Sequence, residues 1–224
     1  MLEMEFPLWR QRLARSLHIN RSQVQSKYYQ VASVCPNGRP KNRTMVFRGF
    51  LAGTQSLLSV TDLRSEKASE WQIENNANFE ICWYFSGSRE QYRLAGEVAL
   101  LSNSIDYGHD DVLLAGQTKE SILKQQWSNL SSRAQEPFFS STPKAPFDIE
   151  SENSNNQGSD SSNESDSNNS AITKAADIKF EISENFGVVI FIPHSVDYLN
   201  LKSKPQERCL YDIQDAWKEV FVNP

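Results

Sequence analysis

The sequence predicts a mainly β fold, an antiparallel barrel with flanking α-helices. Short runs rich in Val, Ile, Tyr and Phe recur along the chain and are separated by turn residues, whereas only three segments show helical spacing. The predicted order is one helix, a series of hairpin-linked strands, helical segments, and then more strands. This order suits an antiparallel barrel rather than a doubly wound parallel sheet. The chain has no GxGxxG and no GxxxxGK[ST], so classical dinucleotide and P-loop folds are disfavoured.

Three helices are expected from apolar stripes and end signals. The first begins after Pro7 and ends near 18–20, with Leu8, Trp9, Leu13 and Leu17 on one face. The second covers 65–73, with Ser65 at its N-cap. The third covers 119–134, and its stripe is Ile122, Leu123, Trp127 and Leu130.

Strands are expected between these helices and after them. An Asn37-Gly38 turn between prolines predicts a hairpin that joins strands 27–34 and 43–51. The remaining strands are predicted at 56–61, 79–85, 91–101, 186–192, 197–202, 209–213 and 217–222. We assign Trp9, Trp71, Trp83, Trp127 and Cys82 to the core.

One segment differs in composition from the rest of the chain. Residues 151–170 contain only Ser, Asn, Gln, Gly, Asp and Glu, a composition typical of disorder. Its four acidic residues account for most of the net charge of −5, so the remainder carries about −1. We expect one domain, with 1–143 as its first part, 144–176 as an insertion and 177–224 as the strands that complete it.

The composition also disfavours several classes of function. Scattered basic residues argue against nucleic-acid binding, and no apolar run approaches a membrane span. The acidic N-terminus lacks the features of a secretory signal. Three widely spaced cysteines and three distant histidines favour reduced thiols in the cytoplasm and no metal site.

Three polar clusters interrupt the strand-like background, at 43–48, 61–67 and 89–93. Hydroxyls and cations in the second cluster could hold a phosphate at a helix start, although a capped helix with surface charges explains it equally well. Arg43 and Arg48 are five residues apart, so on an ideal strand they face opposite sides. Gln91 lies in a strand otherwise suited to burial, where its amide needs partners; neighbouring backbone or a ligand ring could supply them.

The strings Arg43–Phe50 and Thr61–Lys67, followed by Gln91 and by Tyr211 with Trp217, resemble the pyridoxamine 5′-phosphate oxidase-like FMN-binding split-barrel family. The similarity runs from Trp9 to Pro224 outside the acidic insertion. The resemblance implies an antiparallel FMN-binding split β-barrel. It also implies a homodimer with FMN at the subunit interface.

The resemblance assigns cofactor-binding roles position by position. Thr61, Ser65 and Lys67 match the phosphate grip, and Arg64 would supply the charge of an arginine that Glu66 replaces. Gln91, Tyr198 and Arg208 match residues around the flavin. The full set of expected FMN contacts is Arg43, Met45, Val46, Arg48, Val60, Thr61, Arg64, Ser65, Lys67, Gln91, Ser131, Ser132, Tyr198 and Arg208.

The expected substrate contacts depart from the family pattern. Pyridoxamine phosphate oxidases carry Arg-x-His-x-Arg where this chain has Lys204-Pro205-Gln206-Glu207-Arg208. Lys204 and Gln206 are the candidate substrate-binding residues, and Lys lacks the bidentate fork of Arg. The sequence therefore predicts an FMN-dependent oxidoreductase that acts on an unidentified small molecule. Two alternatives stay open: a non-catalytic flavin-binding module, and a true pyridoxamine 5′-phosphate oxidase with altered substrate contacts.

Overall fold

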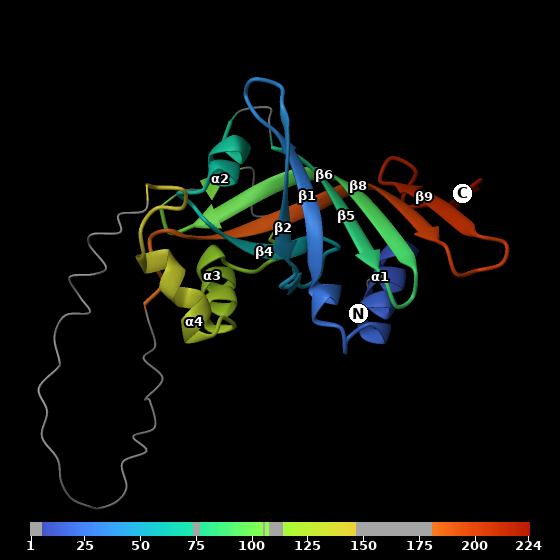
Figure 1. The fold of residues 1–224 in the computed structure, drawn as a ribbon, viewed down its shortest axis with the longest axis horizontal. Coiled ribbons are helices and arrows are strands. Elements are labelled where there is room, and N and C mark those ends of the chain that lie inside the picture. The colour runs from blue at the N-terminus through green and yellow to red at the C-terminus, as the bar shows by residue number, and fades with distance from the viewer. Residues whose placement is uncertain (1–5, 74–76, 105, 108–113, 147–180) are drawn as a thin grey trace, which may run out of the picture.

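A computed structural model describes residues 6–73, 77–104, 106–107, 114–146 and 181–224. Most of the expected insertion, including 151–170, lies outside these residues. The described strands form one antiparallel sheet in the order β10-β9-β8-β6-β5-β1-β2, and β4 joins it by pairing with β8 and β3. Since the path from β2 to β10 does not close, the fold is a split barrel (Figure 1).

The first half of the chain supplies β1 (Tyr28–Val34), β2 (Pro40–Val46), β3 (Gly49–Phe50), β4 (Leu57–Asp62), β5 (Asn78–Phe85), β6 (Glu90–Ser102) and β7 (Asp106–Tyr107). The last part supplies β8 (Phe186–Asn200), β9 (Glu207–Asp212) and β10 (Val220–Val222). β8 pairs with β4 and β6, so the chain after the insertion completes a sheet begun before it.

The β1–β2 hairpin confirms the predicted Asn-Gly turn, where Gly38 has φ +78°. The return strand differs from the prediction, because the extended segment 43–51 is broken between β2 and β3. At the break, the Phe47 amide donates to the Lys27 carbonyl and the Arg48 amide donates to Leu58. Arg48 therefore lies outside the β2 ladder, and strand alternation does not fix its direction.

The two strands predicted at 186–192 and 197–202 are a single strand, β8. Its pairing with β6 shifts register between Ala95 and Gly96, which leaves His194 as an extra residue in a bulge. A Cβ on Gly96 would lie 2.0 Å from the Ile192 carbonyl oxygen, so only glycine fits there. Pro193 lies at this bulge, directly after the predicted strand end at 192.

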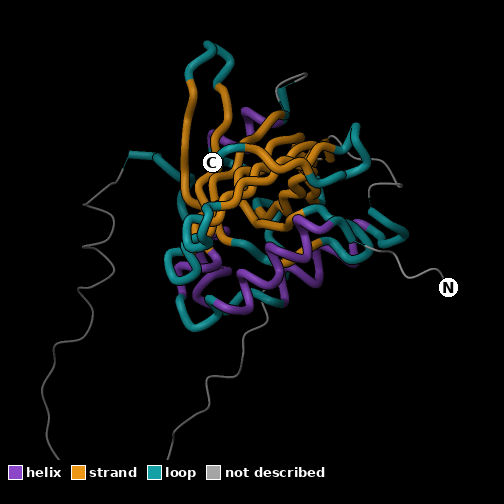
Figure 2. Tube along the Cα trace, turned by 90° about the vertical axis from the view of Figure 1, so that its right-hand side faces the viewer, coloured by secondary structure: helices purple, strands orange, loops and turns teal. Residues whose placement is uncertain are grey.

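The helices are α1 (Leu8–Ile19), α2 (Glu66–Trp71), α3 (Lys119–Ser128) and α4 (Ser132–Gln135), with short 3-10 turns η1 (Val24–Lys27) and η2 (Glu136–Phe139). Most helical segments lie along one side of the strands (Figure 2). The predicted helix 119–134 is split into α3 and α4, because Asn129 caps the first and Ser131 occupies the N-cap of the second.

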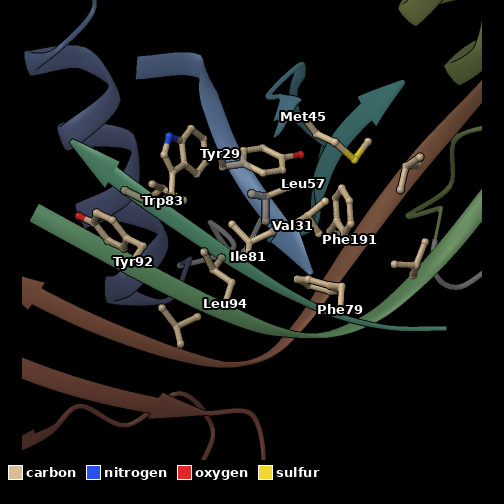
Figure 3. Packing of buried hydrophobic residues seen from close by; sticks show 14 of the residues in the cluster. Tyr29, Val31, Met45, Leu57, Phe79, Ile81, Trp83, Tyr92, Leu94 and Phe191 are labelled. Atoms are coloured by element: carbon tan, nitrogen blue, oxygen red, sulfur yellow. The ribbon is translucent and has the colours of Figure 1, made fainter. Parts of the chain in front are cut away.

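Two apolar clusters lie on opposite faces of the central strands. The first, inside the barrel, is built around aromatic residues that include Tyr29, Trp83 and Phe191, together with Trp9 of α1 (Figure 3). The second joins α3 and α4 to the sheet through Trp127. The four tryptophans expected in the core are at most 5% exposed, which confirms that prediction.

Two further sequence-based predictions, the burial of Cys82 and the start of the final strand, are wrong in detail. Cys82 is only partly buried, because it lies on the outer face of β5, where it pairs with Gln30 and Arg93. The final strand begins at Val220 rather than 217, because Ala216 and Trp217 have positive φ values of 51° and 61° that interrupt an extended chain. Trp217 instead packs against Trp9, with ring centroids 5.6 Å apart.

Candidate functional site

A cationic pocket lies between β2, the start of α2 and the segment that precedes the insertion. It has a volume of about 380 Å³ and is lined by Lys41, Asn42, Arg43, Ser65, Glu66, Lys67, Pro143 and Lys144. The first two polar clusters of the sequence meet here, since α2 lies beside the β1–β2 hairpin (Figure 1). Four cations and one carboxylate therefore surround a space large enough for a phosphate group.

Lys67 is the cation with the least internal compensation. Its ammonium donates to the Ser65 hydroxyl at 3.1 Å and makes no ion pair with any residue that the structure describes. Ser65 in turn donates to the Asp62 carbonyl at 2.6 Å and lies 3.3 Å from the Thr61 hydroxyl. Burial, and then the positive charge of Arg43, lower the pKa of Lys67, and the nearby carboxylates of Asp62 and Glu70 only partly oppose this shift. A bound anion would reverse the second of these effects.

Arg43 is held by a buried carboxylate beneath the pocket. Its guanidinium donates to Glu70 at 3.0 Å and to the Ser33 hydroxyl at 2.6 Å. Glu70 is 4% exposed and also pairs with Lys41 at 2.9 Å. Burial alone would raise the pKa of Glu70, but hydrogen bonds from Ser33, Lys41 and Cys35 outweigh it and the pKa is lowered. Glu70 therefore stays ionised at neutral pH and fixes Arg43 in place.

Glu66 bridges the two lysines at the outer side of the pocket. Its Oε2 lies 2.8 Å from Lys41 Nζ and 2.7 Å from Lys144 Nζ. With Glu70 included, four cations face two carboxylates, a net charge of +2. A phosphate monoester carries about −1.5 to −2 at neutral pH, so the pocket matches its charge.

Sequence reasoning missed Lys41, Lys144 and Glu70 as members of this site. Lys41 had a usable signal, because it is two residues before Arg43 and so shares its strand face. Glu70 also had a signal, because it is three residues after Lys67 on the predicted helix and so shares its face. Lys144 had none, since only the tertiary fold brings its turn to the pocket.

Arg64 does not take part in the pocket. Its guanidinium makes two hydrogen bonds to Asp62, at 2.7 and 3.0 Å, and donates to the Ser140 carbonyl at 2.7 Å. The guanidinium thereby ties the β4–α2 turn to the end of η2. The sequence-based expectation that Arg64 replaces the missing arginine is not supported by this geometry; Lys144 supplies a charge there instead.

Arg48 has a buried donor without a partner. Its Nε is inaccessible to solvent and makes no hydrogen bond within the described part of the chain. Arg48 is not among the residues that line the phosphate pocket, so its expected contact with FMN stays a prediction. Of the apolar residues expected nearby, Met45 is 5% exposed and packs in the core, whereas Val46 and Val60 are partly buried.

Gln91 and Arg208 lie elsewhere, on the outer face of the sheet. Gln91 of β6 pairs with Leu199, which pairs with Arg208 of β9, so the three side chains form one row. Arg208 makes two hydrogen bonds to Asp197, at 2.6 and 3.0 Å, and this carboxylate raises its pKa. Gln91 is partly exposed near the start of β6, not in its buried middle as the sequence suggested.

Tyr198 faces the opposite way from Arg208. It is 2% exposed, and its hydroxyl donates to Glu90 at 2.8 Å within the core. The ring expected to touch the flavin is therefore buried, because neighbouring residues of a strand alternate between faces. We leave Tyr198 out of the site.

The other expected site residues are exposed. Ser131 and Ser132 open α4, and Lys204 and Gln206 lie in the β8–β9 turn. None of these four side chains makes a hydrogen bond within the described residues. Their place leaves them available to a ligand or a second subunit.

The pocket and the Gln91 row cannot grip the same ligand from one protomer. Arg43 lies on β2, three strands away from β6, and the ladder pairs lead from it to Leu94 of β6. Leu94 is three residues from Gln91, so the Cα atoms of Arg43 and Gln91 are roughly 17 Å apart along the sheet. Arg43 also shares the inner face with buried Met45, whereas Gln91 is on the outer face. The structure thus presents two separate half-sites.

Within the described residues, no group of three His, Cys, Asp or Glu side chains is placed to hold a metal ion. No helix in these residues combines the length and apolar character that crossing a bilayer requires.

Comparison with known proteins agrees with this geometry. Residues 6–102 match the family model described as pyridoxamine 5′-phosphate oxidase, FMN-binding domain. The chain is 31% identical to pyridoxine/pyridoxamine 5′-phosphate oxidase 2 of Arabidopsis thaliana, with 96% of each protein covered. It is 35% identical to the crystal structure of a pyridoxamine 5′-phosphate oxidase-related, FMN-binding protein of Nostoc punctiforme. That match covers 99% of this chain and all of the other, with a TM-score of 0.76.

A more distant structure shares the fold only. PhzG of Burkholderia lata is 16% identical, with 96% of this chain and 90% of the other covered and a TM-score of 0.64. The FMN-binding family model and the full-length similarity to a pyridoxine/pyridoxamine 5′-phosphate oxidase show that the cofactor is FMN. Fold, pocket and full-length similarity together establish that this chain belongs to the pyridoxamine 5′-phosphate oxidase family of FMN-binding split-barrel proteins.

Proposed function

We propose that the protein is an FMN-dependent oxidoreductase that acts on a small molecule, with the FMN phosphate in the pocket around Lys67. The observation that carries this proposal is the half-buried Lys67 ammonium, which makes no direct ion pair with any of the described residues although it lines the pocket. A phosphate there would neutralise Lys67 and Arg43 together, and it would accept from the Ser65 and Thr61 hydroxyls once these rotate away from the Asp62 carbonyl to which they now donate. The bound flavin supplies the redox chemistry, while the chain binds and orients it.

We further propose a homodimer in which each FMN contacts both subunits. The two half-sites support this arrangement, because Gln91 and Arg208 are too far from the Lys67 pocket to share its ligand within one chain. In a two-fold dimer, the outer sheet face of one protomer can complete the pocket of the other. The partly buried Arg208 and Gln91 would then hydrogen-bond the ring from the partner subunit, and the exposed Ser131 and Ser132 could join them.

The phosphate assignment is tested by Lys67→Ala, with the exposed Lys124→Ala on α3 as control. Loss of a charge-assisted hydrogen bond of about 1.5–3 kcal/mol should weaken FMN binding about 10- to 100-fold. Riboflavin, which lacks the phosphate, should bind both variants and the wild type alike. Flavin fluorescence titration measures all of these affinities. Equal loss of FMN and riboflavin affinity in Lys67→Ala would contradict the assignment.

The shared site is tested by mixing two variants that each weaken FMN binding, Lys67→Ala and Gln91→Ala, after unfolding and refolding them together. A heterodimer would combine Lys67 of one protomer with Gln91 of the other in one of its two sites. Random pairing should therefore restore about a quarter of the wild-type FMN sites. A mixture that binds no more tightly than its components would refute the shared site.

A second candidate is pyridoxamine 5′-phosphate oxidase activity itself, favoured by the full-length similarity to the Arabidopsis thaliana enzyme. Lys204 and Gln206 in the exposed β8–β9 turn are then the proposed substrate contacts. The flavin-loaded protein should convert pyridoxamine 5′-phosphate to pyridoxal 5′-phosphate with release of hydrogen peroxide. Tight FMN binding without turnover of any electron donor or acceptor would instead identify a flavin-binding module.

We also propose a cytoplasmic location, because Cys35, Cys82 and Cys209 are all free thiols. Fractionation of cells that express the tagged chain tests it. Recovery in an oxidising compartment would refute the proposal.

A further inference from the structure

The outer side of the phosphate pocket contains a carboxylate that the proposed ligand would meet. The ammonium groups of Lys41 and Lys144 both approach the same oxygen of Glu66, at 2.8 and 2.7 Å. Two cations that converge on one oxygen form the arrangement that a phosphate oxygen would take. The Glu66 carboxylate therefore occupies the position that a phosphate oxygen of the ligand would take.

The ion pairs of Glu66 with the two lysines are exposed enough for a phosphate to replace the carboxylate. The side chain of Glu66 is 50% exposed, that of Lys144 is 73% exposed and that of Lys41 is 39% exposed. Exposed ion pairs contribute little to stability, so their opening is easy. Lys41 also keeps a second partner, the buried Glu70 at 2.9 Å, which holds it at the pocket when Glu66 leaves.

The backbone at Lys144 gives an independent reason to look for a function. Ala145 donates to the Thr142 carbonyl at 3.0 Å, which closes a turn with Pro143 second and Lys144 third. Lys144 has φ +66°, and a turn of this kind favours Gly or Asn at the third position. A lysine held in the left-handed region is strained, and such strain gathers at ligand-binding sites.

We propose that Lys41 and Lys144 are additional ligands of the FMN phosphate, and that Glu66 is an internal anion that the phosphate displaces. Glu66 thereby sets the affinity for FMN: it keeps the two lysines in place without ligand and repels the phosphate when it binds. This inference rests on the proposed function, because it requires the FMN phosphate in this pocket.

Two variants test the inference in opposite directions. Glu66→Gln removes one negative charge from the lining of a pocket that would hold a dianion. If the separation is taken as about 8 Å in a water-like dielectric, the repulsion is about 1 kcal/mol, so FMN binding should tighten about five-fold at low ionic strength. Lys144→Asn should weaken FMN binding by a similar factor. Because Asn suits the left-handed region, the same variant should leave the melting temperature of the ligand-free protein unchanged or raised.

Riboflavin is the matched probe, and its affinity should not change in either variant. Both effects on FMN should shrink at high salt. A Glu66→Gln protein that binds FMN no more tightly than the wild type would overturn the inference, as would a Lys144→Asn protein with unaltered FMN affinity. If Lys67→Ala still loses FMN selectively in that case, the phosphate pocket stands and only the role of Glu66 and Lys144 fails. A wild type that binds riboflavin as tightly as FMN would refute both.

Discussion

Glu70 offers the sharpest test of how the phosphate pocket is built. Its carboxylate is 4% exposed and accepts hydrogen bonds from Arg43 at 3.0 Å and Ser33 at 2.7 Å, with Lys41 at 2.9 Å. Glu70→Gln keeps the shape but removes the charge. The charge-assisted bond from half-buried Arg43 is worth about 1.5–3 kcal/mol, while the more exposed Lys41 adds about 0.5. We therefore expect a loss of about 2–3.5 kcal/mol in the free energy of unfolding.

The measurement is urea unfolding of the ligand-free protein, with Glu97→Gln on the exposed side of β6 as control. The loss should appear as a lower midpoint at unchanged slope, and as a fall in melting temperature of about 5–10 °C. Glu97→Gln should stay within about 0.5 kcal/mol of the wild type.

Acid titration adds a second, independent readout. The pKa of Glu70 is lower in the folded state, so its contribution to stability is complete above the unfolded value of about 4.3 and disappears as the pH falls through the folded value. The difference in stability between wild type and Glu70→Gln should therefore narrow below about pH 4.3. A loss under 1 kcal/mol at neutral pH, or a difference that does not depend on pH, would refute the reasoning.

Three further predictions test the fold and the site. Gly96→Ala places a Cβ 2.0 Å from the Ile192 carbonyl oxygen and should cost at least about 3 kcal/mol, so a melting temperature within 2 °C of the wild type would contradict the bulge. Phe191→Ala, which removes a ring packed against Tyr29 and Phe79, should cost about 3–5 kcal/mol in urea unfolding, and a smaller loss would mean that the core collapses around the gap. Arg64→Ala should leave FMN affinity within about two-fold of the wild type, since its guanidinium is bound to Asp62; a loss as large as that of Lys67→Ala would return Arg64 to the phosphate grip.

Features that depend on neighbours in the sequence were accessible from the sequence alone. The sequence located the Asn37-Gly38 turn, the first helix with Trp9, and the strand-to-helix segment that holds Ser65 and Lys67. Turn chemistry and apolar periodicity are local properties, so they could be read without the tertiary structure. The family resemblance also rests on such short strings. It gave the fold and the cofactor, but it transferred residue roles without their geometry.

The tertiary structure decided which charges actually meet. The sequence could not show that Lys144, rather than Arg64, contributes a charge to the pocket. The direction of Arg64 depends on its hydrogen bonds to Asp62 and to carbonyls at the end of η2. The position of Lys144 depends on a turn far away in the chain. The resemblance assigned Tyr198 to the flavin, whereas its side chain in the structure faces the core and donates to Glu90, because tertiary register decides which face a strand residue presents. The sequence thus determined that FMN binds to a split barrel. Only the packing of β2, α2 and the turn at Lys144 decided how the phosphate would be held, since electrostatic sites depend on distances between residues far apart in the chain.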